Sequence, residues 1–135
     1  MTERIATIAV NAAAISLICL VLFFAGTWWR LQDQFALGEE AFRRGDFSGA
    51  VAGYESAIHM YIPFNGTVEK SARQLWIVAE SCERQGDTKR ALIAYRALRS
   101  SFYADHWLLT PGKEWINRCD QKIAALVPLQ RQRQP

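Results

Sequence analysis

Residues 37–58 read LGEEAFRRGDFSGAVAGYESAI, and two helical patterns meet in this stretch at the pair Gly45-Asp46. Before the pair, apolar and small residues recur at the spacing of one helix face, and a second series of this kind follows it. The first series is Leu31, Phe35, Leu37, Gly38, Ala41 and Phe42, and the second is Ala50, Val51, Tyr54, Ala57 and Ile58. Gly45 is expected to take the turn, and Ser48 to cap the second helix. The stretch therefore predicts two antiparallel helices joined by a tight turn.

A weaker copy of the same pattern follows the first. It consists of Leu75, Val78, Ala79, Gln85-Gly86-Asp87, Ala91, Tyr95 and Leu98. Together the two copies resemble the tetratricopeptide repeat, whose period is 34 residues. The resemblance covers residues 30 to 103. The two Gly-Asp pairs lie 41 residues apart, because a longer connection separates the copies.

This resemblance implies an all-α domain of two tetratricopeptide-repeat-like hairpins, with Gly38 and Ala50 small because the helices touch there. Thr110 and Pro111 follow a loop at residues 104–109 and are expected to begin a final helix. Its apolar face would be Trp115, Ile116, Cys119, Ile123 and Leu126, and it would cap the open end of the second hairpin. Pro128 is expected to end this helix. The predicted domains are therefore 1–29, a membrane anchor, 30–127, the helical domain, and 128–135, a basic tail.

The anchor is predicted from residues 5–25, which read IATIAVNAAAISLICLVLFFA and carry no charge. Twenty-one residues at ~1.5 Å each span about 31 Å, close to the hydrocarbon thickness of a bilayer. Trp28, Trp29 and Arg30 follow directly, as is typical of a membrane interface. Phe23 and Phe24 stand where cleavage of a signal peptide would require small residues. We therefore expect an uncleaved transmembrane helix that runs straight into the first soluble helix.

Some residues of the span favour contact with a second transmembrane helix. Asn11 carries an amide that a partner helix could satisfy, and Ala9, Ala12, Ala13 and Ser16 would allow close approach. The alternative is that the alanines are merely tolerated and that Asn11 reaches towards the headgroups. Both interpretations fit the residues.

The side of the membrane follows only weakly from the flanking charges. The arginines after the span lean towards a cytoplasmic domain, whereas the short head before it favours export by a small margin. We expect a single-pass protein of a bacterial inner membrane, with its domain on the periplasmic side.

No motif in the sequence predicts catalysis. The two histidines, His59 and His106, are expected to be structural or solvent-facing, and no HExxH, GxSxG, P-loop or GxGxxG occurs. Cys19, Cys82 and Cys119 have no metal-site spacing. Packing is the expected role of the last two, and a Cys82–Cys119 disulfide is the alternative. We predict no enzyme activity, cofactor or metal. A net charge of +3 without interleaved basic and aromatic residues argues against nucleic acid as a partner.

Partner binding is the function that the resemblance favours. In families with this repeat, the first helix of each hairpin lines a concave groove. By position, that groove would contain Phe35, Glu39, Phe42, Arg43, Arg73, Trp76, Glu80, Glu83 and Arg84. Glu39 and Glu80 replace the asparagines of the family's carboxylate-binding version, so that activity is not implied. The alternative is an ordinary solvated surface with the pairs Glu39–Arg43 and Glu80–Arg84.

We therefore expect a membrane-anchored scaffold or accessory subunit. It would bind other subunits of a membrane complex, or proteins near the lipid bilayer, where tethering raises their effective concentration. The alternative is a membrane-tethered, chaperone-like or quality-control factor that holds exported or membrane clients.

Overall fold

The computed structural model describes residues 2–60, 62, 65–104 and 112–132, and within these ranges it contains five α-helices and no strand. The helices are α1 (Thr2–Arg43), α2 (Phe47–His59), α3 (Gly66–Arg84), α4 (Thr88–Ala104) and α5 (Lys113–Gln132). The prediction of an all-α chain is confirmed for the described residues.

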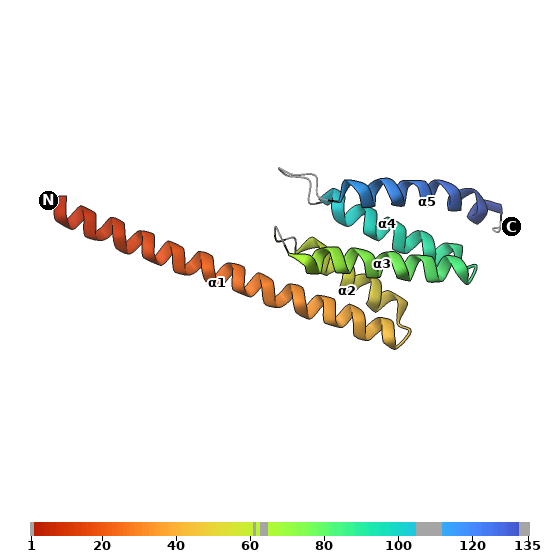
Figure 1. Ribbon diagram of the computed structural model, residues 1–135, viewed down its shortest axis with the longest axis horizontal. Coiled ribbons are helices and arrows are strands. Elements are labelled where there is room, and N and C mark those ends of the chain that lie inside the picture. The colour runs from red at the N-terminus through yellow and green to blue at the C-terminus, as the bar shows by residue number, and fades with distance from the viewer. Residues whose placement is uncertain (1, 61, 63–64, 105–111, 133–135) are drawn as a thin grey trace.

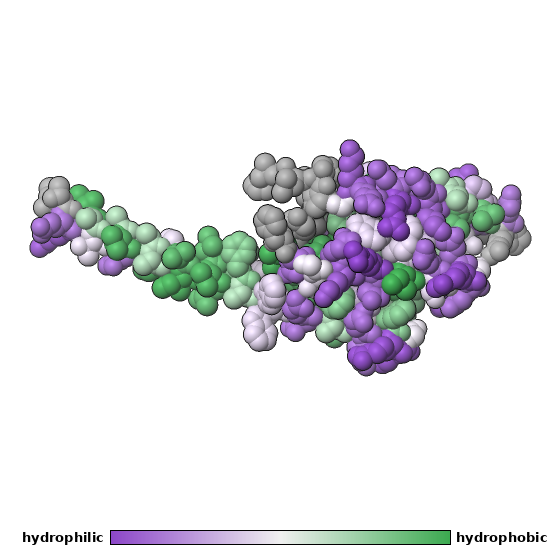
Figure 2. Space-filling model, in the orientation of Figure 1, coloured by the Kyte–Doolittle hydropathy of each residue, from purple (hydrophilic) through white to green (hydrophobic). Residues whose placement is uncertain are grey.

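Helix α1 is continuous over 42 residues, a length of about 63 Å at 1.5 Å per residue. Its first half stands clear of the other helices (Figure 1), and apolar side chains cover much of this half (Figure 2). Among the described helices, α1 alone is long and apolar enough to cross a membrane. The helix passes Gly26 without a break, as expected, and Leu31 is its first fully buried residue.

The other helices alternate in direction and form two layers (Figure 1). Helices α1, α3 and α5 run the same way, and α2 and α4 run against them, packed on each other and on their neighbours. Side-chain contacts between α3 and α5 show their common direction. Glu69 near the start of α3 bonds to Trp115 near the start of α5, and Glu83 bonds to Lys122 further along both helices.

The turns after α1 and α3 have the same backbone geometry. Gly45 and Gly86 have φ angles of 73° and 74°, a conformation that favours glycine because it has no Cβ. At each turn the glycine amide and the following amide donate to carbonyls of the last helical turn, at 2.9–3.1 Å. Both helices therefore end in the same glycine-dependent motif, and the internal repetition seen in the sequence is present in the backbone.

Aspartate caps the helix that follows each turn. The Asp46 carboxylate accepts from the amide of Gly49 at 3.0 Å, and that of Asp87 accepts from the amide of Arg90 at 3.0 Å. The prediction that Ser48 caps α2 is therefore wrong. Asp46 is extended and directly precedes the helix, whereas Ser48 already lies in its first turn.

Two glycines let α1 and α2 approach closely. A Cβ on Gly53 would lie 2.6 Å from the Cα and the amide nitrogen of Gly38. A Cβ on Gly38 would lie 2.9 Å from the ring of Tyr54. The expectation that Gly38 lies at a helix contact is confirmed, and Ala50 is fully buried. Gly53 is the opposing residue, which the sequence pattern did not single out.

Helix α5 covers the second hairpin with the predicted apolar face. Trp115, Ile116, Cys119 and Leu126 are buried, and Ile123 is partly buried. The prediction that Pro128 ends the helix is wrong, since α5 continues to Gln132. Residues 128–132 of the predicted tail are therefore helical. Proline removes one backbone hydrogen bond, a loss that an exposed final turn tolerates because water can satisfy the carbonyl. The predicted cap at Thr110 and Pro111, and the predicted loop at residues 105–109, lie outside the described residues.

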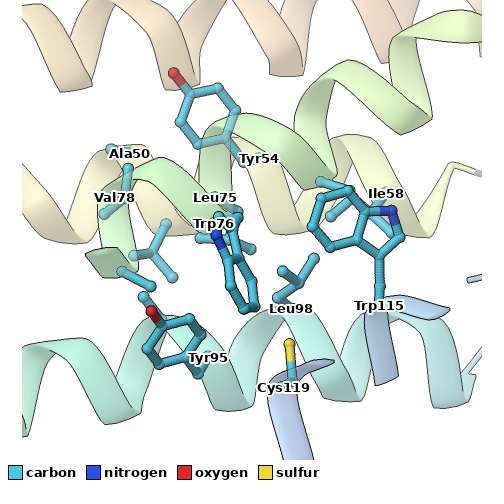
Figure 3. Close-up of a cluster of buried hydrophobic side chains, with 14 of the residues drawn as sticks. Ala50, Tyr54, Ile58, Leu75, Trp76, Val78, Tyr95, Leu98, Trp115 and Cys119 are labelled. Atoms are coloured by element: carbon cyan, nitrogen blue, oxygen red, sulfur yellow. The ribbon is translucent and has the colours of Figure 1, made fainter. Parts of the chain in front are cut away.

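The core joins side chains from all the helices that pack together, α2 to α5 and the second half of α1. Figure 3 shows Tyr95, Leu98 and Cys119 close to Trp76 within it. Cys82 and Cys119 are buried free thiols, as expected for packing residues, and the alternative disulfide is not formed. Burial raises the pKa of the Cys119 thiol to about 12.

Candidate functional site: a cleft between α3 and α5

An aromatic and basic stack joins α3 to α5. The Arg118 guanidinium lies 4.4 Å from the ring centre of Trp76 and 4.6 Å from that of Trp115. Trp76 also makes an edge contact with Tyr95, with ring centres 4.9 Å apart. The Trp115 ring nitrogen donates to the Glu69 carboxylate at 3.0 Å. Trp76 is 8% exposed, so this predicted partner-binding residue is mainly a packing residue that holds α5.

A solvent-open cleft of about 600 Å³ lies beside this stack, and we call it the α3–α5 cleft. Its lining is Glu69, Arg73, Trp76, Ile77, Gly112, Glu114, Trp115 and Arg118. Arg73 is largely exposed and pairs with Glu69 at 3.2 Å. Arg118 forms no ion pair with the described residues, because its two tryptophan contacts hold it away from them. Cation–π contacts leave the edge of a guanidinium open to hydrogen bonds from a ligand.

A second hollow of about 400 Å³ lies further along the same two helices, lined by Glu80, Glu83, Arg84 and Lys122. The Lys122 ammonium donates to both Glu83 oxygens at 2.8 and 3.0 Å, and the Tyr95 hydroxyl donates to Glu83 at 2.8 Å. Partial burial raises the pKa of the Glu83 carboxyl. The hydrogen bonds from Lys122 and Tyr95 and the lysine charge outweigh that effect, so its pKa lies below the ordinary value. Burial and the bond to Glu83 raise the pKa of Tyr95.

The two hairpins differ in which glutamate the buried tyrosine uses. Tyr54 donates to Glu39 at 2.7 Å. At the 41-residue offset, Tyr54 matches Tyr95 and Glu39 matches Glu80, but Tyr95 donates to Glu83 instead. Glu80 therefore has no hydrogen bond or ion pair with the described residues, and it is the open carboxylate of this region.

The structure does not bring the nine predicted groove residues into one site. Phe35 of α1 packs on Tyr54 with ring centres 5.9 Å apart. Phe42 is 40% exposed and lines a separate small pocket of about 120 Å³ at the far end of the hairpins. Arg43 pairs with Glu40 at 2.6 Å. Arg73, Trp76, Glu80, Glu83 and Arg84 of α3 line the hollows beside α5.

The solvated-surface alternative fails at the level of its two pairs. Glu39 accepts from Tyr54, and Arg43 pairs with Glu40, so the pair Glu39–Arg43 is not formed. The pair Glu80–Arg84 is not among the ion pairs of the described residues either.

Sequence reasoning missed the contribution of α5 to these hollows. Trp115, Arg118 and Lys122 come from this helix, which was expected only to cap the domain. Their spacing of three, four and seven residues was a usable signal, because it places all three on one side of a helix.

The predicted transmembrane contact residues divide between two faces of α1. Neighbouring helical residues are rotated by about 100°, so Ala9, Ala12, Ala13 and Ser16 fall within a sector of about 100°. Asn11 points about 150° away from the centre of that sector. One partner helix on the small residues would therefore leave the Asn11 amide unsatisfied.

No group of His, Cys, Asp and Glu in the described part of the chain could hold a metal ion. His59 is exposed at the end of α2, and His106 lies outside the described residues. Comparison with protein families, curated proteins and solved structures finds no match to this chain. The resemblance of residues 30 to 103 to the tetratricopeptide repeat therefore stays a prediction.

Proposed function

We propose that this protein is a membrane-anchored scaffold or accessory subunit, and that its domain binds a partner in a membrane complex. The observation that carries the proposal is the exposed apolar half of α1. Its large side chains, such as Ile8, Leu22 and Phe23, are more than 60% exposed. Exposing apolar surface to water costs roughly 25 cal/mol per Å², and burial of this half in a bilayer removes that cost.

The proposal includes a tetratricopeptide-repeat-like arrangement for the domain. Three features support it: helices that alternate in direction, two layers, and two turns with one geometry 41 residues apart. In such repeats each hairpin packs mainly on its neighbour, so a terminal helix such as α5 is needed to cover the last one.

The α3–α5 cleft is the surface that we assign to the partner. It is open and carries a cation, Arg118, with no ion pair among the described residues, next to the exposed apolar residue Ile77. Apolar contact beside a polar anchor suits the recognition of a protein segment. Any chemistry would belong to the partner, and the shared membrane would raise its effective concentration.

Detergent purification of the tagged full-length chain, followed by identification of co-eluting proteins, tests this function. We expect one partner, or a small defined set, at fixed stoichiometry. A mixed, substoichiometric set of clients would favour the chaperone-like alternative, and the absence of any co-eluting protein would contradict both.

A matched pair of variants tests the cleft itself. Ile77→Asp changes a cleft residue that is 41% exposed, and Ile93→Asp changes an α4 residue that is 44% exposed and outside the cleft. We expect the first to reduce co-elution and the second to leave it unchanged. Equal retention by both would remove the cleft from the proposal.

A further inference from the structure

The helical domain begins directly where the apolar span ends. Trp28 and Trp29 are 50% and 71% exposed, whereas Leu31 is fully buried in the domain. The Gln32 side-chain amide donates to the Thr67 hydroxyl at 2.9 Å, so the first turn of α3 lies level with Gln32. Trp29 precedes Gln32 by three residues, about 4.5 Å along a helix. The chain therefore has no linker between the expected interface and the core.

Four helix ends lie at this end of the domain, which we call its near end. Helices α2 and α4 finish there, and α3 and α5 begin there, on the side from which α1 protrudes (Figure 1). The turns at Gly45 and Gly86 form the opposite end, which we call the far end. Helix α3 connects the two and has 19 residues, a length of about 27 Å.

We propose that the near end rests on the headgroup region of the bilayer and the far end points away from it. The inference relies on the proposed insertion of α1. With the span in the bilayer and the tryptophans at its interface, a gap of less than one helical turn leaves no space between the near end and the lipid. The side chains that start α3 and α5 then contact the headgroups.

The lipid class follows from the charges at the near end. Glu69 and Lys70 lie in the first turn of α3, and Lys113 and Glu114 begin α5. Their charges cancel, so the contact does not need anionic lipid. It fits a zwitterionic headgroup layer, which offers both signs of charge within a few ångströms.

This orientation gives the α3–α5 cleft a direction. The cleft lies along two helices that run away from the bilayer, so it opens sideways, parallel to the membrane surface. Its near half lies beside the headgroups and is level with any segment that leaves the same bilayer next to α1.

A fluorescence experiment on the full-length chain tests the proposal. Single cysteines replace exposed lysines, Lys113→Cys at the near end and Lys89→Cys in the first turn of α4 at the far end. The background is Cys19→Ala. Cys82 and Cys119 are buried, and labelling of the background chain controls for their reactivity. Each chain carries a nitrobenzoxadiazole label and is reconstituted in phosphatidylcholine vesicles, with or without a nitroxide on the headgroup.

We expect the nitroxide to quench the label at residue 113 strongly and the label at residue 89 little. Vesicle flotation separates the two levels of the argument. If the chain floats but both labels are equally bright, the domain stands off the bilayer; if both are equally quenched, it lies on its side. Either result overturns the proposed orientation and leaves the anchor intact. A chain that does not float overturns the anchor, and the orientation with it.

Discussion

At the scale of single residues, the closest approach in the domain gives the sharpest prediction. Gly53→Ala places a Cβ against the backbone of Gly38, which has no side chain that can move aside. Overpacking of this kind costs about 1–3 kcal/mol, so we expect a lower melting temperature for the full-length chain in detergent. Gly66→Ala is the control, since nothing lies within 4 Å of its added Cβ. Equal melting temperatures for both variants would contradict the close packing of α1 on α2.

Glu83 makes stability depend on pH in a defined direction. Its pKa in the folded domain lies below the ordinary value of 4.5. The charged carboxylate therefore stabilises the fold above that value, and the contribution is lost as the pH falls through the lowered folded pKa. We expect Glu83→Gln to reduce stability at neutral pH and to flatten the loss of stability below pH 4.5. Denaturant unfolding between neutral and acidic pH measures this.

Glu80→Gln is the matched control for that series, because Glu80 lies one turn away and has no bonded partner among the described residues. We expect its pH profile to follow the unchanged chain. A flattened profile for Glu80→Gln, with an unchanged one for Glu83→Gln, would reverse the assignment.

The residue scale also shows where sequence reasoning fails. Ser48 and Asp46 are both good capping residues, and only the backbone shows which one precedes the first helical turn. Gly53 was overlooked because one glycine in a helical pattern does not reveal its opposing residue. The helix contact at Gly38 was predictable because small residues recurred on both sides of a recognisable turn.

At the scale of elements, the stack of Trp76, Arg118 and Trp115 leads to a prediction about α5. Truncation of a buried tryptophan costs roughly 3–5 kcal/mol, so Trp115→Ala should release α5 from the domain. Cys119 reports this release, because it is fully buried on α5 and its raised pKa makes the thiol unreactive. In a Cys19→Ala background, we expect a maleimide to label Cys119 in Trp115→Ala but not in the parent.

Cys82 on α3 is the internal control for this experiment. It is buried away from α5, beside Phe42 and Phe47, so it should stay unlabelled when only α5 is released. Labelling of both cysteines would indicate global unfolding. Protection of both would show that the stack is not what holds α5.

Helices and their apolar faces were predictable from this sequence, whereas the site between helices was not. Periodicity identified the buried face of α5, including Trp115 and Cys119. It could not show that Arg118 and Lys122 turn towards α3, because that depends on how two helices are placed in space. The same limit explains Glu83, whose partners come from α4 and α5.

At the scale of the whole molecule, the junction between anchor and domain predicts the smallest independent unit. A chain that starts at Arg30 lacks the apolar span but keeps Leu31, which is fully buried. We expect it to be soluble and strongly helical by circular dichroism. A chain that starts at Gln32 should melt at a lower temperature, because loss of a buried leucine side chain costs roughly 2–5 kcal/mol. Equal melting temperatures would place the domain boundary after Leu31.

The continuity of α1 also creates torsional coupling between the bilayer and the domain. Each residue inserted between Ala25 and Leu31 would turn the domain by about 100° around the helix axis and lift it by only ~1.5 Å. One added residue would therefore redirect the α3–α5 cleft to another azimuth above the membrane, whereas seven would nearly restore it, about 10 Å higher. A partner that grips the span in a fixed rotational state thereby decides where the cleft points.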